Sequence, residues 1–227
     1  MVLEVCAFNI QSCRIAEQAG AGRIEFCFDP LQGGVTPSLG AIQFALQHIN
    51  IPIFPMIRPR GGNFIYDADE LDIMKRDILL CREMGCPGIA TGMQNVDGRI
   101  ATEQLKRLVE WAYPMQVTCH KVFDGSPDAA EALEAVIAAG CTRILTSGLA
   151  KTAIEGAEVL RQLIAQAAGR IIIMPGGGVR STNISELISQ TNAQEYHSSC
   201  IVSRASGQIA DLDEARSIVS ITKTIGG

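Results

Sequence analysis

One unit, a short strand followed by a helix, recurs about eight times along this 227-residue chain. The predicted strands are short apolar runs rich in β-branched residues: Leu3–Ala7, Arg23–Cys27, Pro52–Arg58, Gly88–Gly92, Gln116–His120, Arg143–Ser147, Arg170–Met174 and Glu195–Ser199. Eight parallel strands with alternating helices close into a (β/α)8 barrel, typically of about 250 residues. A doubly wound sheet is the alternative, but it usually has fewer and less evenly spaced strands. The repetition therefore predicts an α/β TIM barrel.

The joints between the predicted helices and strands repeat as well. Gly20 and Gly140 each end a helical segment just before a strand, where glycine supplies a left-handed cap. Asp67 and Glu70 form a capping-box pattern that predicts a helix start. Thr36-Pro37-Ser38 predicts an N-cap followed by proline at the first helical position. Because no linker or low-complexity segment interrupts the repeats, we expect one domain over residues 1–227.

The bulk composition restricts the kinds of partner. Apolar residues make up 47% of the chain and charged residues 19%, which suits a sizeable core. The net charge of −5 disfavours a nucleic-acid partner, because such proteins usually carry a basic patch. The first residues lack a basic region and no apolar run is long enough to span a membrane. We therefore expect neither a signal peptide nor a membrane segment.

The chain contains eight cysteines, and none of them forms a CxxC pair. Without a secretory signal a disulfide framework is not expected. Most of the cysteines should therefore be reduced, buried thiols that act as small apolar side chains.

Polar side chains are predicted to face the inside of the barrel. Successive side chains of a strand point to opposite faces, so when Leu3 and Val5 face the helices, Glu4 and Cys6 face inward. Arg58 is expected at the mouth of the barrel. The same alternation predicts these further inward residues, with Cys119 facing outward: Glu25, Cys27, Thr118, His120, Glu195 and His197.

Two explanations of this interior remain open, because buried charges are costly unless they are paired. One is a closed ion-pair network in which Arg58 neutralises Glu25 or Glu4. The other is a functional site, since these groups converge on the C-terminal mouth, where the sites of such barrels lie. Pro59 and the following glycines are expected to carry Arg60 toward the rim, where it remains available for a ligand.

The chain resembles the CutC family of copper homeostasis proteins. The stretches that carry the resemblance run in family order over about residues 3–200: LEVC at 3–6, RIEFC at 23–27, GGVTPS at 33–38, MIRPRGG at 56–62, HKVFD at 120–124, ILTSG at 144–148, MPGGG at 174–178 and YHSS at 196–199. Lys121 stands where the family usually has arginine, and lysine cannot make the planar two-pronged contact of arginine. The resemblance implies a cytoplasmic, single-domain TIM barrel linked to copper, with homodimerisation as a further expectation.

The first functional hypothesis is a Cu(I) binder. Cu(I) is a soft ion that prefers thiolate and thioether ligands. Cys6 and Cys27 end adjacent predicted strands with the same inward direction, so their sulfurs are expected to approach one another. Two thiolates suffice for a near-linear site, and His120, His197 or Met56 is a candidate third ligand. The alternative is that both cysteines are ordinary buried thiols.

The second hypothesis is an enzyme with isomerase-like or lyase-like acid–base chemistry on a small polar or anionic metabolite. Its candidate catalytic residues are Glu25, His120, Asp124 and His197, because buried carboxyl and imidazole groups can move protons near neutral pH. The candidate ligand-binding residues are Arg58, Arg60, Gly176 and Gly177. The glycines follow the seventh predicted strand, where barrels often bind phosphate. A scaffold without chemistry is a third possibility, which the converging polar interior argues against.

Overall fold

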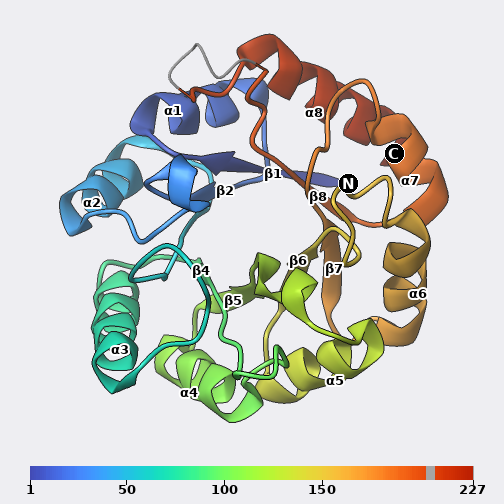
Figure 1. Ribbon diagram of the computed structural model, residues 1–227. Helices are drawn as coiled ribbons and strands as arrows, with labels where there is room; N and C mark the ends of the chain where they lie inside the picture. Colours follow the sequence, from blue (N-terminus) through green and yellow to red (C-terminus); the bar gives the residue numbers. More distant parts are fainter. Residues whose placement is uncertain (203–207, 227) are drawn as a thin grey trace.

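Eight short parallel strands form the centre of the molecule, and eight helices surround them (Figure 1) in the computed structural model, which describes residues 1–202 and 208–226. The strands are β1 (Val2–Ala7), β2 (Arg23–Phe26), β3 (Ile53–Pro55), β4 (Gly88–Thr91), β5 (Gln116–Cys119), β6 (Arg143–Thr146), β7 (Ile172–Pro175) and β8 (Glu195–Ser198). The predicted TIM barrel is thus confirmed. Of the predicted domain at 1–227, residues 203–207 and 227 lie outside the described residues.

The helices alternate with the strands along the chain. They are α1 (Ile10–Ala19), α2 (Leu39–His48), α3 (Ala68–Glu83), α4 (Thr102–Ala112), α5 (Ala129–Ala139), α6 (Ala157–Ala167), α7 (Ile184–Thr191) and α8 (Leu212–Gly226), with short 3-10 helices η1 (Pro30–Gln32) and η2 (Lys121–Gly125) above β2 and β5. Asp67 and Glu70 form the predicted capping box of α3, and Gly20 and Gly140 cap α1 and α5 with left-handed backbone. The predicted start of α2 was wrong, because Ser38 is its N-cap and Pro37 precedes the helix.

Parallel pairing orders the strands into two four-stranded sheets, β3-β2-β1-β8 and β4-β5-β6-β7. Single bridges join the two sheets at both edges: Met56 pairs with Ala90, and Gly176 pairs with His197. In the register of the first sheet, Glu4 lies opposite Arg23 on one side and His197 on the other, and Cys6 lies opposite Glu25. This register brings the predicted inward residues of three strands together.

The main apolar core lies between the strands and the helices. Outward-facing strand residues such as Val5, Ile24 and Ile144 are fully buried there against helix residues such as Leu133. Cys119 belongs to this outer core, as predicted. All eight cysteines are free and buried, which confirms the expectation of reduced thiols. None of the described helices is both long and apolar enough to cross a membrane.

Two predicted strands differ from the observed ones by more than one residue at an end, and the other six differ by a single residue. The predicted strand at 52–58 is confined to β3, because the chain after Pro55 makes only the isolated bridge at Met56 and then turns over the barrel mouth. The predicted strand at 170–174 lies two residues too early, because Gly169 and Arg170 still belong to the turn after α6. Both differences concern strand ends, where pairing rather than propensity sets the boundary.

Candidate functional site

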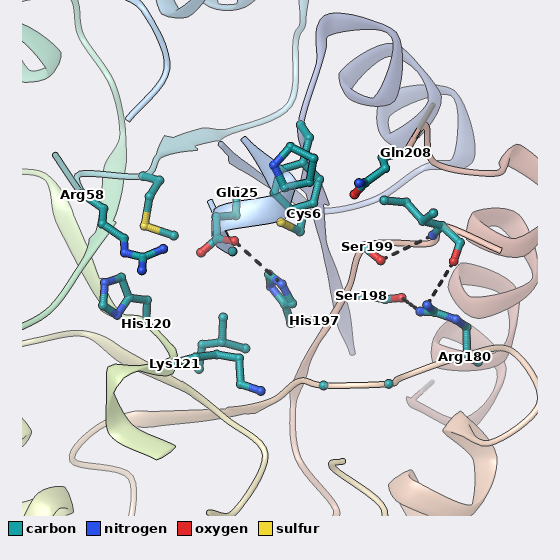
Figure 2. A pocket seen from close by; sticks show the side chains of 18 of the residues that line it. Cys6, Glu25, Arg58, His120, Lys121, Arg180, His197, Ser198, Ser199 and Gln208 are labelled. Atoms are coloured by element: carbon teal, nitrogen blue, oxygen red, sulfur yellow. Dashed lines mark hydrogen bonds and ion pairs between the residues drawn. The ribbon is translucent and has the colours of Figure 1, made fainter. Parts of the chain in front are cut away.

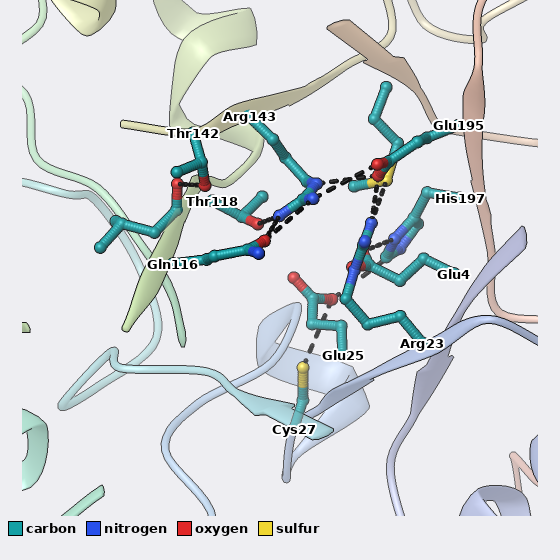
Figure 3. Close-up of polar contacts among 12 residues, drawn as sticks. Glu4, Arg23, Glu25, Cys27, Gln116, Thr118, Thr142, Arg143, Glu195 and His197 are labelled. Carbon is teal, nitrogen blue, oxygen red and sulfur yellow. Dashed lines mark hydrogen bonds and ion pairs between the residues drawn. The ribbon is translucent and has the colours of Figure 1, made fainter. Parts of the chain in front are cut away.

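Four charged residues form a closed ion-pair cluster in the lower part of the barrel, at the amino ends of the strands (Figure 3). Arg23 Nε donates to Glu4, and its Nη2 donates to Glu195 Oε2. Arg143 Nε donates to the same oxygen of Glu195 at 2.8 Å. All four residues are at least nine-tenths buried, so their charges need these partners. Part of the polar interior is therefore a structural network.

Phe54 closes this lower part of the barrel. The guanidinium carbons of Arg23 and Arg143 lie 5.2 Å and 5.5 Å from the centre of its ring, close enough for cation–π attraction. Gly88 on β4 leaves room for the ring, because a Cβ at this position would lie 2.3 Å from the Phe54 ring. The two arginines of the charged cluster therefore pack against an aromatic side chain.

Glu4 links the cluster to the upper part of the barrel. Its Oε1 accepts a hydrogen bond from His197 Nδ1 at 2.7 Å, and His197 Nε2 lies 3.8 Å from Glu25 Oε2. Burial alone would raise the pKa of Glu4, but the hydrogen bond from His197 and the charge of Arg23 lower it to about 2. Burial opposes a charge on His197, yet the neighbouring Cys6 and Glu4 raise the pKa of its imidazole well above 6.5. His197 is therefore an imidazolium at neutral pH.

Cys6 and Cys27 lie side by side at the upper ends of β1 and β2. Their Sγ atoms are 3.9 Å apart, and Cys27 Sγ lies 3.6 Å from Glu25 Oε2. One donor atom of each of the three residues lies within 4.8 Å of the others. Met56 packs with both cysteines in a small apolar cluster that is separate from the outer core. The predicted approach of the two sulfurs is present in the structure.

The two thiols differ in acidity. The hydrogen bond from Cys27 lowers the pKa of Cys6 to about 5 despite burial, and His197 contributes in the same direction. The same hydrogen bond, together with burial, raises the pKa of Cys27 well above 9.0. Burial and the negative charge of Cys6 also raise the pKa of Glu25 well above 4.5. The pair therefore combines a thiolate at Cys6 with a neutral thiol at Cys27.

A pocket of about 480 Å³ opens above these groups at the C-terminal mouth of the barrel (Figure 2). Cys6, Glu25 and His197 line its deep end, together with Met56. Cys27 is not among the lining residues: it is 1% exposed and lies behind Cys6. The remaining lining residues come from strands β6 and β8 and from the loops and short 3-10 helices above the strands: Phe8, Pro30, Gly33, Arg58, Phe64, His120, Lys121, Leu145, Gly177, Gly178, Arg180, Ser198, Ser199, Ile201, Val202 and Gln208.

His120 lines the pocket from the end of β5 and is 3% exposed. Its Nδ1 accepts a hydrogen bond from the N–H of Val122, so the ring proton is carried by Nε2. Nε2 has no hydrogen-bond partner among the described residues. Burial and the charge of Arg58 lower the pKa of His120 to about 3. His120 is therefore a neutral ring with an unused N–H donor.

The two arginines of the 56–62 stretch have partners that the strand pattern does not predict, although Arg58 lines the pocket at the mouth of the barrel as expected. Arg58 is buried but donates to the carbonyl oxygens of Gln32, Gly34 and Gly62, so the predicted pairing with Glu25 or Glu4 is wrong. These carbonyl groups belong to loops whose course the strand pattern does not predict. Arg60 forms an ion pair with Glu70, also donates to loop carbonyl oxygens and is not among the residues that line the pocket, so its predicted contact with a ligand stays a prediction.

Two other predicted site residues lie outside the pocket lining. Asp124 accepts hydrogen bonds from Thr146 Oγ1, from the N–H and hydroxyl of Ser147 and from the N–H of Leu149, which ties η2 to the loop after β6. Gly176 lies against Leu145 and His197, whereas its neighbour Gly177 lines the pocket. Asp124 thus holds the loops that form the pocket wall.

The comparisons with known proteins agree on one family. A model of the CutC family matches residues 1–202. The chain belongs to the CutC family. It is 44% identical over 206 residues to the copper homeostasis protein cutC homolog of Mus musculus, which covers 91% of this chain and 76% of the mouse protein. A CutC family protein of Chromobacterium violaceum is 44% identical over 209 residues, covering 92% of this chain and 83% of that protein.

Solved structures show the same relationship. The CutC protein of Streptococcus agalactiae superposes with a TM-score of 0.83 at 33% identity, over 88% of this chain and 98% of that chain. Phosphoribosylanthranilate isomerase of Thermotoga maritima, with a TM-score of 0.65 at 12% identity over 99% of this chain and 100% of that one, shares the fold alone. The segment matched by the CutC model contains all the pocket-lining residues except Gln208.

Sequence reasoning missed several residues that shape this CutC pocket and its floor. Arg23 and Arg143 are the cations of the buried cluster. Each lies two residues before an inward strand residue, Glu25 or Leu145, so strand alternation also predicts that both arginines point inward. Phe64 and Arg180 lie on loops, where no periodic pattern points to the pocket.

Proposed function

We infer that this chain is a copper homeostasis protein that binds Cu(I) through Cys6 and Cys27 at the C-terminal mouth of the barrel. The observation that carries this inference is the separation of 3.9 Å between two buried sulfur atoms, of which that of Cys6 belongs to a residue that lines the pocket. A Cu(I) ion needs two soft donors that approach from different directions, and these sulfurs come from adjacent strands.

The surroundings of the sulfurs suit a soft cation. The thiolate, rather than the thiol, is the ligand, and the lowered pKa of Cys6 supplies one thiolate at neutral pH. In the free protein, the proton of Cys27 is shared with Cys6 in a hydrogen bond. A bound Cu(I) ion would displace this proton. Met56, which carries a thioether, belongs to the same small apolar cluster as both cysteines. His197, an imidazolium held by Glu4, helps to lower the pKa of Cys6 and thus favours its thiolate.

The names of the relatives support the same reading, because the mouse and human proteins are described as copper homeostasis proteins. A cytoplasmic location and a homodimer remain predictions for this chain. Cell fractionation tests the location, and light scattering after size-exclusion chromatography tests the homodimer.

The acid–base alternative has less support. His120 is neutral, with its pKa lowered to about 3, so it is a poor base at neutral pH. Both carboxylate oxygens of Asp124 already accept hydrogen bonds from the end of β6 and the loop after it. The remaining pair, Glu25 and His197, surrounds the thiols and is more simply explained as part of their environment.

Metal analysis of anaerobically purified protein tests the proposal. The wild type is expected to hold one Cu(I) per chain with copper–sulfur scattering in X-ray absorption, and a Cys6→Ser/Cys27→Ser variant is expected to lose it. The matched control is Cys81→Ser/Cys86→Ser, because these two buried thiols also interact with one another but lie far from the pocket lining. The proposal is wrong if the first variant keeps stoichiometric copper, or if the control variant loses it.

A further inference from the structure

The wall of the pocket opposite the thiols carries features that copper binding does not use. Lys121, at the start of η2, places its ammonium group against the loop after β7: a Cβ on Gly177 would lie only 3.2 Å from Lys121 Nζ. Lys121 and Gly177 both line the pocket, with Gly178 beside them. The absence of a side chain at Gly177 therefore lets a cation meet the backbone of this loop.

The glycine loop presents free backbone donors. The carbonyl oxygen of Gly177 accepts from the N–H of Ala153, and that of Gly178 accepts from the side-chain amide of Asn183. Within residues 1–202 and 208–226, the backbone hydrogen bonds include none from the N–H group of either glycine. Since the carbonyl groups are held by the protein, these N–H groups remain available to a ligand at the pocket wall.

The charge of this wall favours an anion. Arg58 and Arg180 line the same pocket, and in the described part of the chain both donate only to uncharged oxygens. Lys121 has Asp124 at 3.4 Å, but that carboxylate already accepts several hydrogen bonds from the loop after β6. The positive charges of this side are thus incompletely neutralised by carboxylates.

His120 adds a donor of a different kind. Its Nε2–H is buried and unpartnered within the described residues, and the residue itself is part of the pocket lining. A buried donor without an acceptor is energetically costly, so it points to a ligand atom that accepts a hydrogen bond. The ring is held in this tautomer by Val122 and in position by Phe64, whose ring centre lies 4.8 Å away. A neutral donor of this type suits a carbonyl or hydroxyl oxygen.

We propose that the pocket is a binding site for a small organic anion that carries both an oxyanion group and a neutral oxygen. The oxyanion, a carboxylate or a phosphate, binds at Lys121 and the N–H groups of Gly177 and Gly178. The neutral oxygen accepts the hydrogen bond of His120 Nε2. A pocket of about 480 Å³ accommodates such a metabolite.

Calorimetric titration of the copper-free, reduced full chain at matched ionic strength tests the oxyanion contact. The probes are acetonyl phosphate for a phosphate group and levulinate for a carboxylate group, each of which also carries a ketone. At least one of them is expected to bind with a Kd below about 10 mM, and Lys121→Gln is expected to weaken it about 10-fold. The control is Lys106→Gln, which removes the same charge from an exposed position on α4 and leaves the affinity unchanged.

The ketone contact is tested with matched probes in which a methylene replaces the carbonyl. Wild type is expected to prefer acetonyl phosphate to propyl phosphate, or levulinate to pentanoate, about 10-fold, because the alternative leaves His120 Nε2 unpaired. His120→Phe is expected to remove this preference. In the wild type, saturation with the ketone probe is expected to shift the Nε2 proton resonance downfield, and this measurement needs no variant.

The results separate the possible ligand classes. Tighter binding of acetonyl phosphate assigns a phosphorylated metabolite, and tighter binding of levulinate assigns a carboxylate. The proposal is overturned if neither probe binds below about 10 mM, or if Lys121→Gln and Lys106→Gln have equal effects. An unchanged His120 resonance on saturation overturns the ketone contact. None of these outcomes depends on copper, so the proposed metal site is tested independently of the anion site.

Discussion

The lower and upper parts of the barrel interior both contain buried polar residues, but these residues are paired in the lower part and incompletely paired in the upper part. In the lower part, Glu4, Arg23, Arg143 and Glu195 form a closed set of ion pairs beneath the ring of Phe54. In the upper part, His120 Nε2 and Glu25 Oε1 are buried without partners among the described residues, and two thiols lie in contact. The lower groups satisfy one another, whereas the upper groups leave hydrogen-bonding capacity for a ligand.

This difference teaches that burial of a charged residue does not by itself mark a functional site. A buried charge with good partners is structural, and removing one partner is strongly destabilising because the other charge is left uncompensated. Buried polar atoms without partners are rare in folded proteins and therefore carry more information about ligands. Glu4 belongs to both parts, since it binds Arg23 below and His197 above.

The largest effect is expected from Arg23→Met. This change leaves Glu4 and Glu195 with one fewer cation in the lower part, so the free energy of unfolding should fall by about 3–5 kcal/mol. Urea unfolding followed by circular dichroism measures the loss. Arg161→Met, which removes one partner of an exposed ion pair with Glu158, is the control and should leave the midpoint nearly unchanged. Equal effects of the two changes would contradict the structural role of the buried ion-pair cluster in the lower part.

A smaller, pH-dependent effect is expected at Glu195. Hydrogen bonds from Arg143 and Arg23 overcome burial and lower the pKa of this carboxyl below 4.5. Its ion pairs therefore stabilise the folded state fully above its unfolded pKa, and this contribution disappears as the pH falls through the lower folded pKa. Glu195→Gln should reduce stability at pH 7, and the difference from wild type should shrink in acid.

Urea unfolding of wild type and Glu195→Gln between pH 7 and pH 3 measures this change. Glu134→Gln serves as a control, because Glu134 forms an ion pair with Arg170 at the surface. A difference between wild type and Glu195→Gln that stays constant over the whole pH range would contradict an ion-pair role for Glu195.

The smallest effect is expected at His120 in the upper part. Because burial and Arg58 lower the pKa of His120 to about 3, its ring should not titrate between pH 5 and pH 8. Nitrogen NMR of the imidazole rings should show one constant tautomer, with the proton on Nε2. A midpoint near 6.5, the usual value for histidine, would show that the ring is not held as a neutral donor.

The sequence predicts the barrel and its inward residues well, because both depend on local periodicity. The alternation that points Glu4, Cys6 and Glu25 inward needs only the strand positions, and the structure places all three in the interior. The approach of Cys6 to Cys27 follows from the adjacency of consecutive strands. The family resemblance, which rests on short motifs along the chain, is confirmed by the family model.

Partner choice is what the sequence does not predict. The cluster below Phe54 depends on the register that sets Glu4 opposite Arg23, and alternation alone carries no register. Arg58 binds carbonyl groups of loops, and Arg60 binds Glu70 on α3, because the chain turns sharply after Pro59. The pocket wall at Lys121 and Gly177 also depends on loop conformation, which has no periodic signal.

Two single bridges close the barrel between its two four-stranded sheets, and the pocket-lining groups of each kind come from one sheet or the other. The sulfur donors and Met56 come from the sheet that contains β1, β2 and β3, whereas His120, Lys121 and Gly177 follow strands of the other sheet. Among the described residues, single bridges (Met56 with Ala90 and Gly176 with His197) take the place of a strand ladder between the two half-barrels, and the ion pair between Arg143 and Glu195 also joins them. The distance between the soft-metal donors and the anion donors is therefore set by the contacts between the two half-barrels and not by the hydrogen-bond ladder of either half.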